Sequence, residues 1–112
     1  MDNNIYDLLI LGSGPAGISA AIYAERFNLK SAMIGELFGG TVMYPHKITN
    51  YPGYSEISGI ELIQKFQDHL SSINYKPLED QIIKINKVDS TFEVFLRNKD
   101  RIISKNILIL PL

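Results

Sequence analysis

The sequence predicts an α/β protein, with a three-stranded parallel sheet to which a β-meander is appended. Three observations support this fold class. A nearly continuous apolar run, Ile5–Leu11, ends at Gly12, which is typical of a strand buried on both faces. A helical pattern and a second short apolar run follow it, which together indicate a βαβ unit. Three further strand-like segments then precede a last apolar run.

Residues 1–35 form the predicted βαβ unit. Pro15 suits the first turn of a helix, where its missing N–H would have no partner in any case. The helical pattern extends to Phe27 and is followed by a second strand, Ser31–Ile34. The helix carries a stripe of small residues that permits close approach to a sheet: Gly17, Ala20, Ala21 and Ala24.

Residues 36–58 are predicted to form a long ordered loop, because they are rich in glycine and include two prolines. Loops longer than about 12–15 residues are uncommon in small domains and usually functional. A second helix is predicted over residues 59–72, where Ser58 and Glu61 have the spacing of a capping box. Its apolar face consists of Ile60, Ile63, Phe66 and Leu70.

Residues 80–104 are predicted to form the β-meander, which makes the crossover from the second helix. Its strands are Ile82–Val88, Phe92–Leu96 and Arg101–Ser104, with a hairpin turn at residues 97–100. The apolar residues 106–110 are expected to return to the parallel sheet, giving the strand order second, first, last. Because the helices lie chiefly on one side, we expect the other face of this sheet to expose apolar surface.

The composition is that of one small globular domain and excludes several functions. A formal net charge of −1 in 112 residues predicts no long-range attraction for nucleic acid or an acidic membrane. Neither the polar opening, residues 1–4, nor the short run Leu8–Leu11 resembles a signal peptide or a membrane span, so a cytoplasmic location is expected. The absence of cysteine excludes disulfides and cysteine nucleophiles. His46 and His69 have no ligand-spaced partners, so no metal site is predicted.

Residues 12–17 match the pattern G-x-G-x-x-G, placed between a buried strand and a helix. In a dinucleotide site the first glycine makes the tight turn, the second admits the pyrophosphate and the third lets helix and strand pack closely. The helix N-terminus offers N–H groups and a positive dipole to the phosphates. The motif therefore predicts a partial Rossmann-like FAD/NAD(P)-binding fold; the alternative is a tight turn without a ligand.

Glu36 lies 19 residues after Gly17, just beyond the second predicted strand. In this fold an acidic residue near this position binds the ribose hydroxyls of the adenosine. The alternative is a solvated loop carboxylate. No arginine neighbours Glu36 in the sequence to accept a 2′-phosphate, so FAD or NAD is favoured over NADP.

The sequence also resembles the thioredoxin reductase family. The resemblance covers the first 70 residues well and the hairpin region loosely. It rests on several motifs in the family's order: residues 6–17, the run Ala20–Ala24, Gly39-Gly40, Asn50-Tyr51-Pro52-Gly53 and Ser58-Gly59-Ile60-Glu61-Leu62.

The resemblance implies a first domain that binds FAD, a second domain that binds NADPH, and a Cys-x-x-Cys pair that passes electrons to a thioredoxin-like partner. It places the glycine motif at the pyrophosphate, and it places residues 39–41 and Asn50 near the ribityl chain and flavin. The candidate cofactor-binding residues are Gly12, Ser13, Gly14, Pro15, Ala16, Gly17, Glu36, Gly39, Gly40, Thr41 and Asn50. No catalytic residue is predicted.

The chain departs from the family pattern at several points. Thr41 stands where the family usually has glutamine, and Thr49 replaces an acidic residue. After the last apolar run the family continues with an Ala-Thr-Gly turn, whereas this sequence has Pro111-Leu112. The NADPH domain, the cysteine pair and the late Gly-Asp segment over the flavin have no counterpart in these 112 residues.

Three functions remain open on the sequence. The first is the truncated FAD-binding portion of a thioredoxin reductase-like NAD(P)H-dependent flavoprotein oxidoreductase, inactive by itself. Its expected partners are FAD and a missing C-terminal portion or partner chain, and a homo-oligomer is possible. The second is a non-catalytic interaction module or split-protein half that binds another chain across its uncovered sheet. The third is a small NAD-binding domain.

Overall fold

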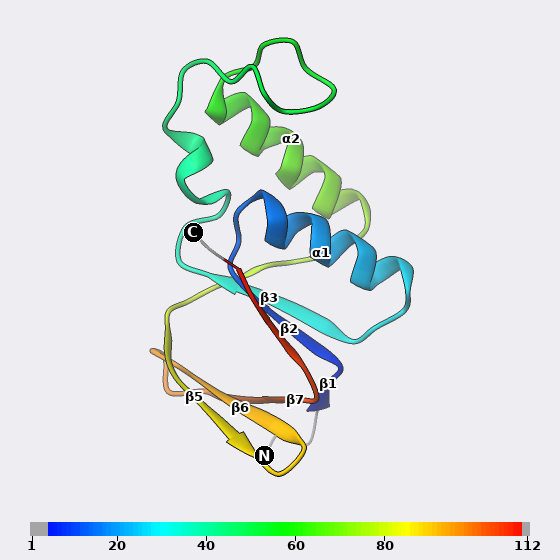
Figure 1. The fold of residues 1–112 in the computed structure, drawn as a ribbon, viewed down its shortest axis with the longest axis vertical. Helices are drawn as coiled ribbons and strands as arrows, with labels where there is room; N and C mark the ends of the chain where they lie inside the picture. Colours follow the sequence, from blue (N-terminus) through cyan, green and yellow to red (C-terminus); the bar gives the residue numbers. More distant parts are fainter. Residues whose placement is uncertain (1–4, 111–112) are drawn as a thin grey trace.

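The computed structural model describes residues 5–110, and within them it contains two four-stranded sheets and two α-helices (Figure 1). The polar opening, residues 1–4, and the Pro111-Leu112 departure lie outside the described residues. In chain order the elements are β1 (Ile5–Tyr6), β2 (Leu8–Leu11), α1 (Pro15–Arg26), β3 (Ser31–Gly35), the 3₁₀ helix η1 (Gly40–Met43), α2 (Gly59–Ser72), β4 (Leu78–Glu79), β5 (Ile82–Val88), β6 (Thr91–Leu96), β7 (Arg101–Ser104) and β8 (Ile107–Ile109).

One sheet is parallel throughout, with the strand order β4–β3–β2–β8. The predicted α/β class is confirmed, and the predicted order of second, first and last strand is that of β3, β2 and β8. The sheet has four strands rather than the predicted three, because β4 pairs with the end of β3, with Leu78 opposite Ile34. Both residues of β4 are exposed, so no apolar run marks this strand in the sequence.

The first apolar run is two strands in different sheets, not the single strand that was predicted. β1 pairs with β7, whereas β2 pairs with β3 and β8. Between them, Oδ2 of Asp7 accepts a hydrogen bond from the N–H of Lys30 at 2.9 Å, and Oδ1 lies 3.6 Å from the ammonium of Lys105. The Lys30 N–H, chiefly, and the Lys105 charge lower the pKa of Asp7. This polar residue interrupts the apolar run, and the chain changes sheets there.

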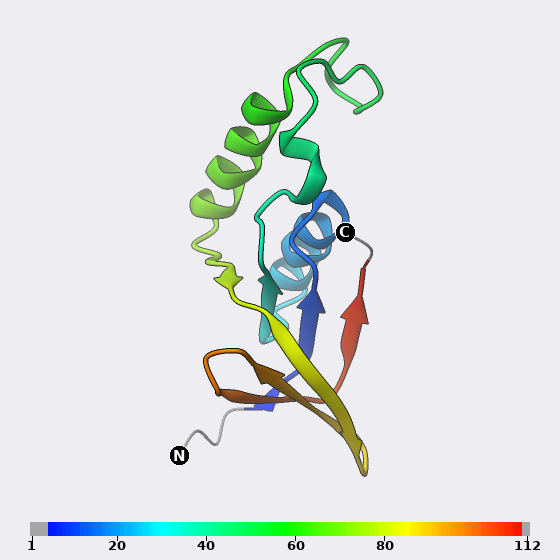
Figure 2. The same cartoon turned by 90° about the vertical axis from the view of Figure 1, so that its left-hand side faces the viewer.

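Both faces of the parallel sheet are covered (Figure 2). Successive strand residues point to opposite faces, so Ile10 and Met33 pack with α1 and α2, while Leu9 and Ile34 pack with Val94 of β6. The expectation of an exposed apolar face is therefore wrong. The reason is that the meander, on its way from α2 to β8, folds back across that face.

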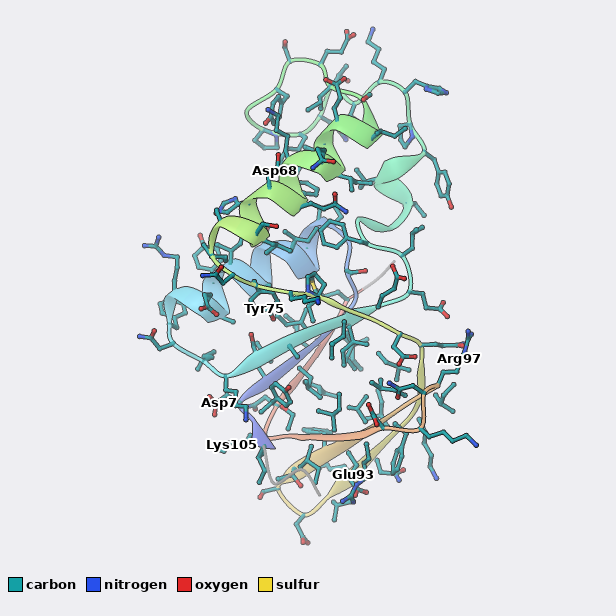
Figure 3. All side chains as sticks on the ribbon, turned by 180° about the vertical axis from the view of Figure 1, so that it is seen from behind. Asp7, Asp68, Tyr75, Glu93, Arg97 and Lys105 are labelled. Carbon is teal, nitrogen blue, oxygen red and sulfur yellow. The ribbon has the colours of Figure 1, made fainter. Side chains whose placement is uncertain are left out.

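The second sheet has the order β1–β7–β6–β5 and contains the predicted meander. In the turn at residues 97–100, Lys99 adopts a left-handed conformation with φ 75°. The N–H of Asp100 donates to Oδ1 of Asn98 at 2.8 Å. Across β6 and β7, Arg101 forms an ion pair with Glu93, which is labelled at the bottom of Figure 3.

The loop of residues 36–58 is partly regular. It contains η1 and an antiparallel bridge between Ile48 and Ile57, neither of which was predicted. At its end, Oγ of Ser58 accepts a hydrogen bond from the N–H of Glu61 at 3.1 Å and donates to the Glu61 carboxylate at 3.0 Å. This side-chain cap begins α2 at the residue that the capping pattern indicates.

Candidate dinucleotide-binding site

The glycine motif connects the carboxyl end of β2 to α1, at the edge of the parallel sheet where β3 also ends (Figure 2). Gly14 is the N-cap of α1 and Pro15 is its first residue. An α-helix leaves the N–H groups of its first turn without intrahelical partners. In α1 no side chain caps them, and the first turn contains no acidic residue. The positive end of this helix is therefore available to an anion.

The three glycines of the motif are required for different reasons. Gly12 has φ +138°, a conformation that side chains rarely adopt. A Cβ on Gly17 would lie 2.1 Å from the carbonyl oxygen of Gly12, so only glycine allows α1 to approach this closely. A Cβ on Gly14 would meet nothing nearer than the Gly39 oxygen at 4.0 Å. The fold itself therefore tolerates a side chain at Gly14, and space is open there beside the helix N-terminus.

Ser13 joins the glycine motif to the segment that follows β3. Its buried hydroxyl donates to the carbonyl of Leu37 at 2.9 Å, and its own carbonyl accepts from the N–H of Gly39 at 2.7 Å. Gly35 must lack a side chain, because its Cβ would lie 2.2 Å from the Ser13 hydroxyl. The Ser13 hydroxyl thus makes a hydrogen bond within the protein, and its role toward a cofactor stays a prediction.

The structure brings Gly39 and Gly40 next to the glycine motif. Both have positive φ, +85° and +62°, and a Cβ on Gly40 would lie 3.6 Å from the Cα of Gly14. A Cβ on Gly39 would lie 2.6 Å from the side chain of Ile63 in α2. These glycines let the loop pass closely between α1 and α2, and so they form a second wall beside the open space at Gly14.

The other candidate residues lie at the surface. Ala16 is exposed in the first turn of α1, and Pro15 is half-buried. Thr41 is exposed in η1, and Asn50 is exposed two residues after the bridge residue Ile48. Their side chains are accessible to a ligand, and their roles stay predictions.

Glu36 follows β3 directly and is exposed. Its carboxylate lies 3.5 Å from the guanidinium of Arg97, which comes from the β6–β7 turn. The guanidinium of Arg97 also donates to the side-chain oxygen of Gln81, and its backbone N–H donates to the Gln81 carbonyl at 2.9 Å. The inference that no arginine stands beside Glu36 is therefore wrong in space, although it holds along the sequence. No spacing rule reveals this contact, because it depends on the position of the meander.

A cavity of about 700 Å³ lies beside the glycine motif. It is lined by Ser13, Gly35, Phe38, residues of α2 and residues 74–79. Tyr75 lines this cavity; its hydroxyl lies 2.9 Å from that of Ser31, and burial raises the pKa of Tyr75. Figure 3 shows Tyr75 on the segment that leaves α2, with Asp68 on the helix above it. Ser13 alone among the candidate cofactor residues lines this cavity.

Among residues 5–110, no three His, Cys, Asp or Glu side chains gather closely enough to hold a metal ion. No helix in this part of the chain has the length and apolar character needed to cross a membrane.

Comparison with known proteins identifies the family. Residues 6–109 match the family described as pyridine nucleotide-disulphide oxidoreductase. Thioredoxin reductase of Mycoplasma genitalium is 40% identical over 108 residues, which are 96% of this chain and 34% of that protein. Thioredoxin reductase of Mycoplasma pneumoniae is 38% identical over the same share of each chain.

Solved structures agree with these relatives. The crystal structure of thioredoxin reductase from Streptococcus pyogenes superposes with a TM-score of 0.86 at 38% identity, covering 96% of this chain and 35% of that one. A ferredoxin-flavin thioredoxin reductase from Clostridium acetobutylicum superposes with a TM-score of 0.88 at 34% identity, covering 95% and 37%. This chain spans about a third of the length of these proteins. It therefore belongs to the pyridine nucleotide-disulphide oxidoreductase family and corresponds to the N-terminal, FAD-binding part of the thioredoxin reductases.

Proposed function

We propose that this chain binds FAD, with the pyrophosphate at the glycine motif, and that it is the cofactor-binding portion of an NAD(P)H-dependent thioredoxin reductase-like oxidoreductase. The observation that carries the proposal is the open space at Gly14. Gly12 and Gly17 are explained by backbone conformation and packing, but no contact within the fold requires Gly14. A ligand at the uncapped N-terminus of α1 supplies the missing reason.

The glycine motif cannot hold FAD by itself. A helix dipole contributes about 0.3–2 kcal/mol to an anion at its N-terminus. Micromolar binding requires about 8 kcal/mol. The remaining free energy must come from contacts along the rest of the cofactor. Glu36 is the proposed contact to the adenosine ribose, and Gly39, Gly40, Thr41 and Asn50 are the proposed contacts to the ribityl chain and flavin.

Bound FAD would supply the electron-transfer chemistry, and the residues of this chain would bind and orient it. The chain contains no cysteine, so it has no dithiol to reduce a disulfide partner. We propose that a further C-terminal portion or a partner chain supplies the NADPH site and the dithiol, and that this chain alone is not a catalyst. A cytoplasmic location and a homo-oligomer stay predictions.

An absorbance scan tests the proposal directly. The purified chain is scanned as isolated, then again after incubation with FAD and desalting. Retention of the flavin bands near one FAD per chain is the expected result. FMN serves as the control ligand, because it lacks the adenosine and the pyrophosphate; it should be removed by desalting.

Two outcomes would contradict the proposal. Binding of NAD in preference to FAD, measured by calorimetry, would favour the small NAD-binding domain instead. A folded chain that binds neither would leave the glycine motif as a bare turn. The interaction module has lost its main support, because the meander covers the sheet face that it was expected to use.

A further inference from the structure

Three segments that are far apart in the sequence meet at the end of β3. Glu36 follows β3, Gln81 lies between β4 and β5, and Arg97 begins the β6–β7 turn. Figure 3 shows Arg97 at the end of the hairpin, beside the segment that leads into β5. We refer to Glu36, Gln81 and Arg97 as the ribose-end cluster, because the proposed function puts the adenosine ribose at Glu36.

The backbone under this cluster is fixed by hydrogen bonds. The N–H of Asp80 donates to the carbonyl of Gly35 at 3.2 Å, which holds the β4–β5 link against the end of β3. The N–H of Arg97 donates to the carbonyl of Gln81 at 2.9 Å, which holds the hairpin against the same link. These hydrogen bonds hold together the backbones of the three segments that carry Glu36, Gln81 and Arg97. The fold therefore places the Arg97 side chain near Glu36.

The ion pair itself is weak and open to a ligand. The side chains of Arg97 and Glu36 are 68% and 59% exposed, and their charged atoms are 3.5 Å apart. Exposed pairs of this kind contribute little to folding, since water screens both charges. A ligand at this position can consequently rearrange the pair at little cost in protein stability.

The two charges recognise different forms of the same ligand. A carboxylate accepts hydrogen bonds from ribose hydroxyls and repels a 2′-phosphate, whereas an arginine binds phosphate through charge-assisted, bidentate hydrogen bonds. We propose that Arg97 is a latent receptor for a 2′-phosphate: its guanidinium can bind the phosphate, but in the native chain the Glu36 carboxylate is paired with it. In the native chain the pair selects an adenosine with a free 2′-hydroxyl; without the Glu36 carboxylate, Arg97 selects the 2′-phosphorylated form. This inference rests on the proposed binding of an adenosine dinucleotide.

The test compares ADP with 2′,5′-ADP as probes of the adenosine end. Their dissociation constants are measured by calorimetry for the native chain, Glu36→Ser, Arg97→Gln and the double variant, at two salt concentrations. The native chain should bind ADP more tightly. Glu36→Ser should gain about tenfold in affinity for 2′,5′-ADP, as expected for hydrogen bonds to a charged group, and the gain should shrink at high salt. Adding Arg97→Gln should abolish it.

The same hairpin offers a matched control. Arg101 pairs with Glu93 on the outer part of the meander, so Glu93→Ser and Arg101→Gln remove an equivalent ion pair from another place. Neither variant should change the ratio of the two dissociation constants. Circular dichroism before each titration shows that the variants are folded, and a variant that fails to fold is replaced by Glu36→Gln or Arg97→Lys.

The outcomes separate this inference from the proposed function. If the native chain binds FAD and ADP but Glu36→Ser gains nothing for 2′,5′-ADP, the latent receptor is refuted and the proposed function stands. A gain that persists in the double variant also refutes it, because Arg97 would not be the receptor. If the native chain binds neither FAD nor ADP, both proposals fail.

Discussion

The glycine motif and the ribose-end cluster lie at the same edge of the parallel sheet, but they are built in opposite ways. The glycine motif is made of backbone, is short in sequence and is fixed by close contacts such as that between Gly17 and Gly12. The ribose-end cluster is made of exposed side chains from three distant segments. Substitutions at the tightly packed positions of the glycine motif should therefore affect folding, whereas those at its open position, Gly14, and in the ribose-end cluster should chiefly affect ligand binding.

Gly17→Ala should have the largest effect. The new Cβ would lie 2.1 Å from the carbonyl oxygen of Gly12, and backbone on both sides cannot move away without separating α1 from β2. We expect a loss of about 3 kcal/mol or more in the free energy of unfolding, measured by urea denaturation. Ala16→Gly in the same turn is the control and should cost about 1 kcal/mol or less. Equal losses for the two would refute the steric role of Gly17.

Gly14→Ala tests whether every residue of the glycine motif serves folding. The backbone of Gly14 has φ −79°, which alanine adopts readily, and the new Cβ would have nothing within 4.0 Å except the Gly39 oxygen. Stability should therefore change by less than about 0.5 kcal/mol. Affinity for FAD, measured by quenching of flavin fluorescence, should fall about tenfold, which is about 1.4 kcal/mol.

Ser90→Ala, in the exposed turn between β5 and β6, is a suitable control for Gly14→Ala and should change neither quantity. Unchanged FAD affinity in Gly14→Ala would remove the main support for a pyrophosphate at this helix N-terminus. A large loss of stability would show instead that Gly14 belongs with Gly17 as a packing residue.

The glycine motif and the ribose-end cluster also differ in how far the sequence predicts them. The glycine motif, α1 and the buried strands are predictable, because the requirement for glycine, the first-turn proline and the apolar runs are local features. The pairing of Glu36 with Arg97 is not predictable, because it requires the meander to fold across the sheet. β4 is not predictable because a strand of two residues, Leu78 and Glu79, is too short to show an apolar pattern. The break at Asp7 is not predictable because a single polar residue is compatible with a continuous strand.

Asp7 combines features of both regions, because it is a charged side chain at the surface that accepts a hydrogen bond from the backbone. The Lys30 N–H, helped by Lys105, lowers the pKa of Asp7 in the folded chain. A lowered pKa stabilises the fold above the pKa of the unfolded chain, about 3.9, and this contribution is lost as pH falls through the folded value. The native chain should therefore lose stability relative to Asp7→Asn between about pH 5 and pH 3. Thermal melts of both proteins across this range measure the difference; parallel curves would contradict it.

The smallest effect on stability is expected at the ribose-end cluster. Arg97→Gln removes an ion pair whose side chains are 68% and 59% exposed, so the free energy of unfolding should fall by less than about 0.5 kcal/mol. Arg101→Gln removes the neighbouring pair with Glu93, whose side chains are 44% and 17% exposed and thus less screened by water. The same change should therefore cost more there, and urea denaturation of the two variants measures the difference. If Arg97→Gln is the more damaging, the guanidinium helps to hold the hairpin on the sheet, and the ribose-end cluster would then be part of the fold like the glycine motif beside it.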